Sequence, residues 1–283
     1  MIYLITGSTG NIGSLVTESL IARGIRPRVF VRDPEKARSR YGNHAEIHAG
    51  DLSDARSFSL AMVGADVLFL VNSGPDLAQL DALAADAAVA AGVKLLVKLS
   101  SYDAREQNVG TGVWHAAGEA AILQRSIPFT FVQPSGFMSN ALYWAKSIKS
   151  EGVVRSATGQ GRIPFIHPKD IADVAVEALI RREYAGQSLP ITGPEALSYA
   201  EMGGIIGSVI GEEIRFVDMS EEEARAQQID WKTPPALTEA RLSIFRAIRE
   251  GRLSEVTGAV NAVLGRKPIP FAHWARENAA SFR

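Results

Sequence analysis

The chain contains no cysteine among its 283 residues, which excludes disulfide bonds, thiolate metal sites and cysteine nucleophiles. It also lacks a strong charge of either sign, with a formal net charge of -1. Such a balance creates no long-range field that gathers nucleic acid or an anionic membrane, so we expect neither as a partner. No apolar run reaches the length of a membrane span. Because an apolar run begins at Ile2, we expect no signal peptide and a cytoplasmic protein.

What the chain does contain is a repeated pattern of short apolar runs and helix-compatible stretches. The runs predicted as strands are residues 2–6, 27–32, 45–51, 65–71, 93–100 and 128–134. Strands that are apolar on both faces and alternate with helices indicate an α/β fold with a doubly wound parallel sheet. After about residue 150 the pattern changes to fewer strands and more helices, with strand candidates at residues 188–192 and 212–218. We therefore predict a smaller, mostly helical C-terminal lobe.

Three glycines spaced three apart follow the first predicted strand and precede an amphipathic helix. A helix N-terminus offers free backbone N–H groups and the positive end of the helix dipole to an anion. Gly7 permits the tight turn, Gly10 lets the backbone approach a ligand, and Gly13 lets helix and strand pack closely. Such a loop within a strand-helix repeat predicts a dinucleotide site, although any strand-to-helix turn can use glycines. The residues predicted to contact the cofactor are Gly7, Ser8, Thr9, Gly10, Asn11, Ile12 and Gly13.

The end of the second predicted strand bears on the choice of nicotinamide cofactor. An acidic residue there binds a ribose 2′-hydroxyl, whereas a basic one accommodates a 2′-phosphate. This strand ends with Arg32, and Lys36 follows within a turn. We predict that both bind NADP(H) in preference to NAD(H). The alternative is that both are solvated surface charges and that Asp33 points inward.

Small and polar residues also follow the later strands, at the sheet edge where such folds bind ligands. Each group alone is equally typical of a turn or a helix cap. Their shared position favours cofactor contact. The residues predicted on this basis are Asp51, Leu52, Asn72, Ser73, Gly74, Ser100, Ser101, Pro134, Gly136 and Phe137.

The segments "TGSTGNIG", "VRDPEKA", "GDL", "HAAGEAAI" and "IPFTFVQPSGFMSN" occur in this order along the chain. Together they resemble the NmrA-like branch of the atypical short-chain dehydrogenase/reductases. Within that branch the likeness is to bacterial NADPH-dependent quinone reductases and triphenylmethane reductases. The resemblance implies a Rossmann domain over residues 1–150, a substrate-binding lobe over residues 151–283 whose segments can interleave with it, and a cleft between the two.

Short-chain dehydrogenases usually carry Y-x-x-x-K, but none of the six tyrosines here has a lysine four residues later. Its place is taken by His115 and Glu119, which are also four apart and share one helical face. His115 is our first catalytic candidate, to orient substrate or relay a proton. Tyr102, after the fifth strand, is the second. Glu119 is predicted to contact the cofactor. The alternative is a helix-face pair that merely packs near the cofactor.

The missing tyrosine narrows the chemistry, because reduction of a simple ketone needs a proton donor as the hydride arrives. A quinone or a conjugated dye needs mainly to be stacked against the nicotinamide. We predict an NADPH-dependent oxidoreductase that passes hydride directly to a small conjugated or aromatic acceptor, without flavin or metal, acting as a monomer or homodimer. The sequence contains no H-E-x-x-H motif, so we expect no zinc site. The alternative is a non-catalytic NADP(H)-binding redox sensor of the NmrA type.

Large aromatic residues supply candidates for the wall of an acceptor pocket. Tryptophan is more often part of a hydrophobic core, so a packing role is the competing interpretation for each. The candidates are Trp114, Trp144 and Trp231.

Overall fold

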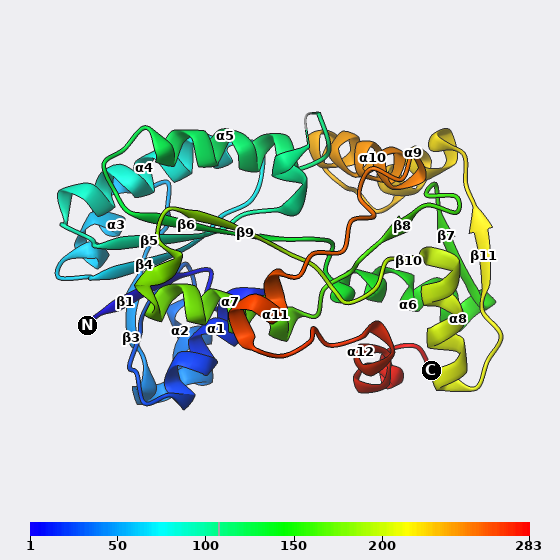
Figure 1. Cartoon of the computed structure of the whole chain (residues 1–283), viewed down its shortest axis with the longest axis horizontal. Helices are drawn as coiled ribbons and strands as arrows, with labels where there is room; N and C mark the ends of the chain where they lie inside the picture. The colour runs from blue at the N-terminus through cyan, green and yellow to red at the C-terminus, as the bar shows by residue number, and fades with distance from the viewer. Residues whose placement is uncertain (107) are drawn as a thin grey trace. The chain divides into compact units, whose positions relative to one another are not determined.

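A seven-stranded sheet dominates the computed structural model, which describes residues 1–106 and 108–283. Its strands are β1 (Tyr3–Thr6), β2 (Arg28–Val31), β3 (Glu46–Ala49), β4 (Val67–Val71), β5 (Leu95–Leu99), β6 (Phe129–Pro134) and β9 (Gln187–Ile191). They lie in the order β3-β2-β1-β4-β5-β6-β9, and the five pairs from β3 to β6 are parallel (Figure 1). The chain builds outward from β1 in one direction and then in the other from β4, which makes a topological switch between them. The predicted Rossmann-type sheet is confirmed.

Helices cover both faces of this sheet. They are α1 (Asn11–Ala22), α2 (Pro34–Tyr41), α3 (Ala55–Met62), α4 (Leu77–Ala90), α5 (Gly112–Leu123) and α7 (Pro168–Ile180). Figure 1 shows α3, α4 and α5 on one face and α1, α2 and α7 on the other, where α1 packs on α7. Buried apolar side chains of α3, α4 and α5 join those of β1, β4, β5 and β6 in one core cluster. This packing explains why the strands are apolar on both faces.

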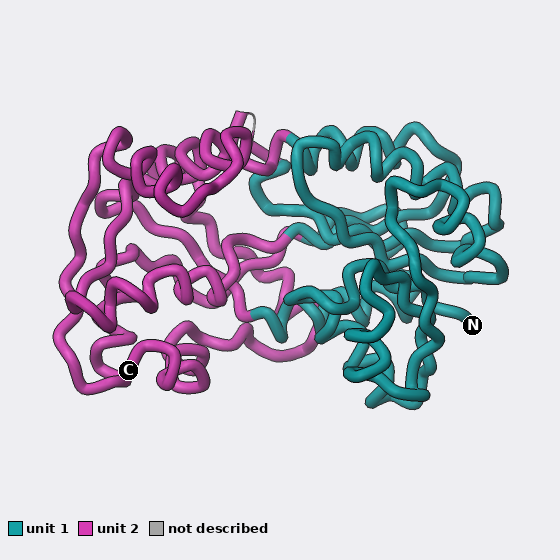
Figure 2. Tube along the Cα trace, turned by 180° about the vertical axis from the view of Figure 1, so that it is seen from behind, with its two compact units in different colours: residues 1–104, 114–133, 168–189 teal, residues 105–113, 134–167, 190–283 magenta. Residues whose placement is uncertain are grey.

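The chain divides into two compact units whose segments alternate along the sequence (Figure 2). Unit 1 comprises Met1–Ala104, Trp114–Gln133 and Pro168–Leu189, and unit 2 comprises Arg105–Val113, Pro134–His167 and Pro190–Arg283. The sequence predicted a boundary near residue 150 with such interleaving. The strand β9, which the sequence pattern placed with the C-terminal half, instead completes the main sheet next to β6.

Unit 2 is largely helical. Its helices are α6 (Ala145–Glu151), α8 (Tyr199–Ile210), α9 (Glu221–Asp230), α10 (Pro235–Arg249), α11 (Ala259–Leu264) and α12 (Phe271–Glu277). Two small sheets accompany them: β7 (Val153–Ser156) runs parallel to β11 (Arg215–Asp218), and β8 (Arg162–Ile163) runs antiparallel to β10 (Leu197–Ser198). Of these strands the sequence predicted only β11, and the other three are too short to show a recognisable alternation. Ser198 and Ser220 begin α8 and α9 with capping boxes.

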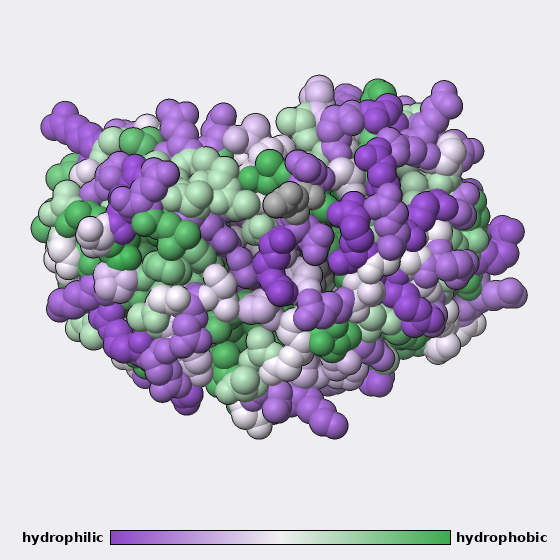
Figure 3. All heavy atoms as spheres, turned by 45° about the horizontal axis from the view of Figure 1, so that its top comes forward, coloured by the Kyte–Doolittle hydropathy of each residue, from purple (hydrophilic) through white to green (hydrophobic). Residues whose placement is uncertain are grey.

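Short 3-10 helices connect several of these elements. They are η1 (Gly42–His44), η2 (Tyr102–Arg105), η3 (Met138–Trp144), η4 (Arg182–Tyr184) and η5 (Ala279–Ser281). Across residues 1–106 and 108–283, no helix is both long and apolar enough to span a bilayer. The face drawn in Figure 3 correspondingly intersperses hydrophobic patches with hydrophilic side chains.

Candidate functional site

The glycine loop connects β1 to α1 and is packed too tightly for side chains at two of its glycines. Gly7 has φ +61, a left-handed conformation that glycine adopts at little cost. A Cβ on Gly7 would lie 3.0 Å from Cβ of Val71. A Cβ on Gly13 would overlap the carbonyl oxygen of Gly7. The loop therefore presents backbone, and β1 and α1 approach one another as closely as the sequence predicted.

The N-terminus of α1 is open to an anion. Gly10 is its N-cap, no side chain caps it, and its first turn holds no acidic residue. Ser8 is fully buried, and its Oγ has no hydrogen-bond partner in the described part of the chain. A buried hydroxyl without a partner is costly unless a ligand satisfies it. The loop thus fits a pyrophosphate. Of the other predicted contacts in this loop, Thr9 is half-buried, Asn11 is exposed and Ile12 is buried.

The two cations predicted to select NADP(H) lie exposed after β2. Neither Arg32 nor Lys36 forms an ion pair with any described residue, whereas Arg38 on the same segment pairs with Glu35. The carboxylate of Asp33 caps α2 by accepting a hydrogen bond from the backbone N–H of Lys36 at 3.0 Å. Asp33 is therefore engaged locally, and two unpaired positive charges remain at this strand end.

The segment after β3 is held by a local turn. Asp51 accepts hydrogen bonds from the backbone N–H of Ser53 at 2.9 Å and from its hydroxyl at 2.6 Å. The hydrogen bond from the Ser53 hydroxyl, and after it the one from the Ser53 backbone, lower the pKa of Asp51 and keep its carboxylate ionised. Leu52 packs against the hydrophobic core that the sheet forms with α3 and α4. The predicted cofactor contacts of both residues stay predictions.

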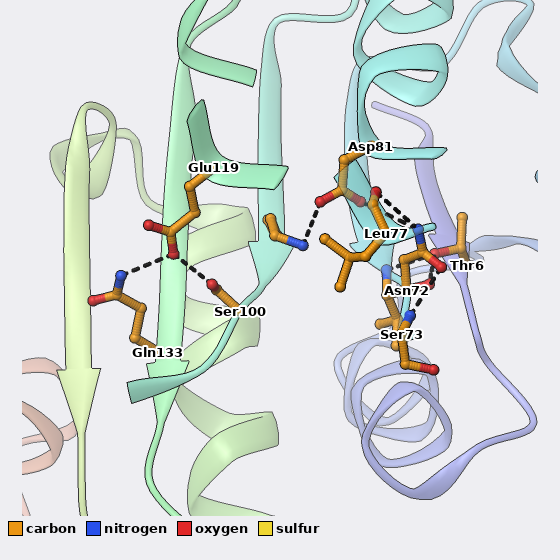
Figure 4. Close-up of polar contacts among 10 residues, drawn as sticks. Thr6, Asn72, Ser73, Leu77, Asp81, Ser100, Glu119 and Gln133 are labelled. Carbon is orange, nitrogen blue, oxygen red and sulfur yellow. Dashed lines mark hydrogen bonds and ion pairs between the residues drawn. The ribbon is translucent and has the colours of Figure 1, made fainter. Parts of the chain in front are cut away.

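The segment after β4 leads from the sheet to a buried carboxylate on α4. The amide nitrogen of Asn72 lies 3.4 Å from both the carbonyl oxygen of Leu77 and Oδ1 of Asp81. Its amide oxygen accepts the backbone N–H of Ser73 at 2.8 Å. Gly74 follows with φ +108, which favours glycine. Asn72 is thereby oriented by α4 (Figure 4).

A second polar group joins β5, β6 and α5. Oε1 of Glu119 accepts hydrogen bonds from the hydroxyl of Ser100 and, at 2.8 Å, from the amide of Gln133 (Figure 4). Burial raises the pKa of Glu119, and these two hydrogen bonds partly offset that rise. Ser101, next to Ser100, donates its hydroxyl proton to Asp103. The structure therefore brings together Ser100 and Glu119, two residues that the sequence predicted at the cofactor.

Sequence reasoning missed the charged pair behind this group. Nζ of Lys98 on β5 lies 2.6 Å from Oδ2 of Asp81 on α4, and both side chains are 0% exposed. A Cβ on Gly118 would overlap Asp81 and Leu77, so α4 and α5 are in close contact here. A signal existed, because a lysine inside a strand that is apolar on both faces needs a buried partner.

His115, one turn before Glu119 on α5, is electrically neutral near pH 7. Burial, and then the positive charge of Lys98, lower its pKa to about 3. Its Nδ1 is buried without a hydrogen-bond partner among the described residues. The neutral ring can form a hydrogen bond with a ligand, but at neutral pH it lacks the second ring proton that an imidazolium acid would donate. Tyr102 is buried in η2, and the roles of both residues stay predictions.

The predicted contacts after β6 belong to unit 2, where Pro134 ends the strand. A Cβ on Gly136 would overlap the ring of Phe165. The carbonyl oxygen of Gly136 accepts the backbone N–H of Ile166 at 2.8 Å, and Phe137 forms a parallel bridge with Ile166. This loop is therefore fixed by the segment that crosses it.

The three tryptophan candidates differ in exposure. Trp144 is buried and packs against Tyr199 with ring centroids 4.8 Å apart. Trp114 is half-buried. Trp231 is exposed. Packing thus accounts for Trp144, whereas Trp231 is open to a ligand.

A family model described as NAD(P)H-binding matches residues 7–182, which include the glycine loop, β2 and α5. The chain belongs to this family. Across residues 1–106 and 108–283 the structure holds no cluster of three or more potential metal ligands.

Relatives of this NAD(P)H-binding protein include reductases that match it along nearly the whole chain. A (4-alkanoyl-5-oxo-2,5-dihydrofuran-3-yl)methyl phosphate reductase of Streptomyces griseus is 35% identical and aligns over 99% of this chain and 98% of its own. An NAD(P)H azoreductase of Xenophilus azovorans is 33% identical over 99% and 98%. The protein is thus an NAD(P)H-dependent oxidoreductase.

Solved structures share its fold. An NADPH-dependent quinone oxidoreductase of Escherichia coli, complexed with NADPH, superposes with a TM-score of 0.88 at 22% identity, covering 98% of this chain and 99% of its own. The Citrobacter triphenylmethane reductase complexed with NADP(H) gives 0.87 at 23% identity, covering 99% and 100%. A mutant NmrA gives 0.79 at 16% identity over 98% and 94%. The predicted NmrA-like likeness is confirmed.

Proposed function

We propose that this protein is an NADPH-dependent reductase that passes hydride directly to a quinone-like or other conjugated, electron-poor acceptor, without flavin. The observation that carries the proposal is a complete phosphate loop combined with a helix α5 that lacks the tyrosine and lysine of Y-x-x-x-K. The residues at the corresponding spacing are His115, whose ring is neutral, and Glu119, whose carboxyl is already hydrogen-bonded. The His115 ring is not an imidazolium near pH 7, and Glu119 accepts both of the hydrogen bonds that hold its carboxylate, so neither reproduces the tyrosine–lysine pair.

The names of the two relatives agree with such acceptors. One reduces an oxo-dihydrofuran phosphate and the other an azo compound. Both groups contain an electron-poor multiple bond, which accepts hydride without a dedicated acid because the resulting charge is delocalised. We extend this acceptor chemistry to the present chain.

In this proposal the glycine loop, the two cations after β2 and a carboxylate of α5 bind the cofactor in unit 1. NADPH, when bound, supplies a hydride, and the acceptor takes that hydride together with one proton from solvent. The α1 N-terminus and the backbone of Gly7 and Gly10 hold the pyrophosphate. Arg32 and Lys36 bind the 2′-phosphate, which makes NADPH the preferred cofactor. Glu119 accepts a hydrogen bond from the cofactor through its second carboxylate oxygen, and Ser100 and Gln133 hold its first.

The test is oxidation of NADPH, followed by its absorbance, in the presence of quinones, azo dyes and conjugated imines. NADH is measured in parallel. The variant Arg32→Gln/Lys36→Gln should lower kcat/KM for NADPH by about 10- to 100-fold, because it loses charge-assisted hydrogen bonds to the 2′-phosphate. It should leave NADH turnover unchanged.

The control variant is Arg38→Gln, because Arg38 is already paired with Glu35. It should keep the cofactor preference of the wild type. Tight NADPH binding without oxidation by any acceptor in the panel would contradict the reductase proposal and support the redox-sensor alternative.

A further inference from the structure

Two exposed aromatic rings of unit 2 are stacked on one another. Tyr143 is 58% exposed and Trp231 is 46% exposed, and no other large aromatic side chain in the described part of the chain is exposed. Their ring centroids lie 6.3 Å apart with an interplanar angle of 21°. Tyr143 belongs to η3, and Trp231 lies between α9 and α10. Exposed aromatic surface gathered in one place is typical of a binding site.

An arginine lies over the tyrosine of this pair. Cζ of Arg241 is 5.2 Å from the ring centroid of Tyr143, within the range of a cation–π contact. Its Nη1 donates a hydrogen bond at 2.8 Å to Oε1 of Gln228, a side chain that is itself buried. The guanidinium is thereby held in a fixed place by neutral partners.

Arg241 also differs from two other arginines of α10, which are paired with carboxylates. Arg246 binds both carboxylate oxygens of Glu221 at 2.8 Å, and Arg249 pairs with Asp218 at 2.5 Å. No carboxylate among the described residues pairs with Arg241. Of these three cations, the one above the aromatic pair is therefore the one that keeps its charge available to an anion.

The backbone that carries Trp231 is constrained. Lys232 has φ +55 at the end of α9, where glycine is usual. Its N–H donates to the carbonyl oxygen of Ile229 at 2.8 Å, and the N–H of the next residue donates to Gln228 at 3.0 Å. A left-handed lysine is strained, and such strain is concentrated at functional positions. Lys232 forms no ion pair with a described residue, and the acid on the same turn is Asp230.

We propose that Tyr143, Trp231 and Arg241 form a binding site for a planar conjugated molecule that carries a negative charge, and that the hydride acceptor belongs to this class. The second clause rests on the proposed function. The rings stack on the planar part of the molecule. The guanidinium binds a carboxylate, sulfonate or phosphate on its edge.

The experiment uses a matched pair of acceptors, naphthoquinone and naphthoquinone sulfonate, with NADPH as the donor. Arg241→Gln should raise KM for the sulfonate about tenfold, the loss of one charge-assisted contact. It should change KM for the neutral quinone much less, so that the ratio of the two KM values rises above that of the wild type. Trp231→Ala should raise KM for both quinones. Comparing the ratio of the two KM values between each variant and the wild type removes the difference in redox potential between the quinones.

The matched control is Arg246→Gln, on the same helix but paired with Glu221. It should keep the wild-type ratio of the two KM values. An Arg241→Gln protein with the wild-type ratio overturns the site, and so does an Arg246→Gln protein that changes the ratio as much.

Calorimetric binding of naphthalene sulfonate, without NADPH, separates this inference from the proposed function. Binding that weakens in Arg241→Gln and Trp231→Ala supports the site even if the wild type reduces no acceptor, an outcome that would contradict the proposed function alone. Turnover of quinones together with binding that is unaffected by both variants overturns the site and leaves the proposed function standing.

Discussion

The glycine loop and the polar group around α5 lie in the same unit but are built in opposite ways. The loop works through missing side chains, since Gly7 and Gly13 leave backbone where a Cβ would collide. The group around α5 works through charged side chains buried together, with Lys98 and Asp81 fully enclosed behind Glu119. One region depends on space and the other on charge balance. Substitutions that disturb volume and charge separately should therefore affect the two regions differently.

The largest expected effect comes from filling the loop. In Gly13→Val the new side chain would collide with the backbone of Gly7, so the loop must move away from the geometry that holds a pyrophosphate. NADPH binding should be lost, measured by calorimetry, and overpacking should lower the free energy of unfolding by about 1–3 kcal/mol. Gly204→Ala is the control, because its Cβ would meet no atom within 4 Å. Retained NADPH affinity in Gly13→Val would contradict a phosphate-binding role.

The next effect, on stability rather than on cofactor binding, should come from breaking the buried charge balance. Lys98→Met leaves Asp81 buried without its cation and should lower the free energy of unfolding by about 3–5 kcal/mol, measured by urea denaturation. The double variant Lys98→Met/Asp81→Asn removes both charges and keeps the shape that Gly118 packs against, so it should recover most of this loss. A double variant no more stable than the single one would show that volume, rather than charge, matters here.

The smallest effect concerns pH. His115 has a pKa of about 3 in the folded protein and 6.5 as its ordinary value. Below about pH 6.5 the unfolded chain therefore binds a proton that the folded chain does not, and the free energy of unfolding falls with pH down to about 3. His115→Leu should remove this contribution.

The measurement compares urea unfolding of both proteins at about pH 5 and about pH 7. The difference between them isolates His115, because Glu119, whose raised pKa acts in the opposite direction, is present in both. An equal loss of stability at the lower pH in both proteins would mean that the imidazole protonates in the folded state at its ordinary pKa.

The loop was predictable from sequence because its information is local. Three glycines between an apolar run and an amphipathic helix leave few alternatives, and the structure shows the close approach at Gly13 that the spacing indicates. Arg32 and Lys36 lie exposed after β2, and their predicted contact with a 2′-phosphate stays a prediction. Such features depend on residues within one strand-loop-helix unit.

The cluster around α5 was only partly predictable because its partners are distant in sequence. His115 and Glu119 were found by their spacing, but the low pKa of His115 depends on burial and on Lys98 in another element. Asp81, on α4, gave no local sign that it pairs with β5. The stacking of Tyr143 with Trp231 likewise joins η3 to the end of α9. Tertiary packing, rather than any local pattern, creates these contacts.

The place of α7 in unit 1 and of β9 in the main sheet has a consequence for the order in which the chain can fold. The hydroxyl of Thr130 donates to the carbonyl oxygen of Tyr184 at 2.9 Å, and α7 covers α1. During synthesis, β6 remains an open sheet edge and the apolar face of α1 remains uncovered until residues near 190 have left the ribosome. A fragment that ended near residue 150 would keep the glycine loop yet expose both surfaces. The nucleotide-binding half thus acquires its own stability only after the first two segments of the other unit, Arg105–Val113 and Pro134–His167, have been made.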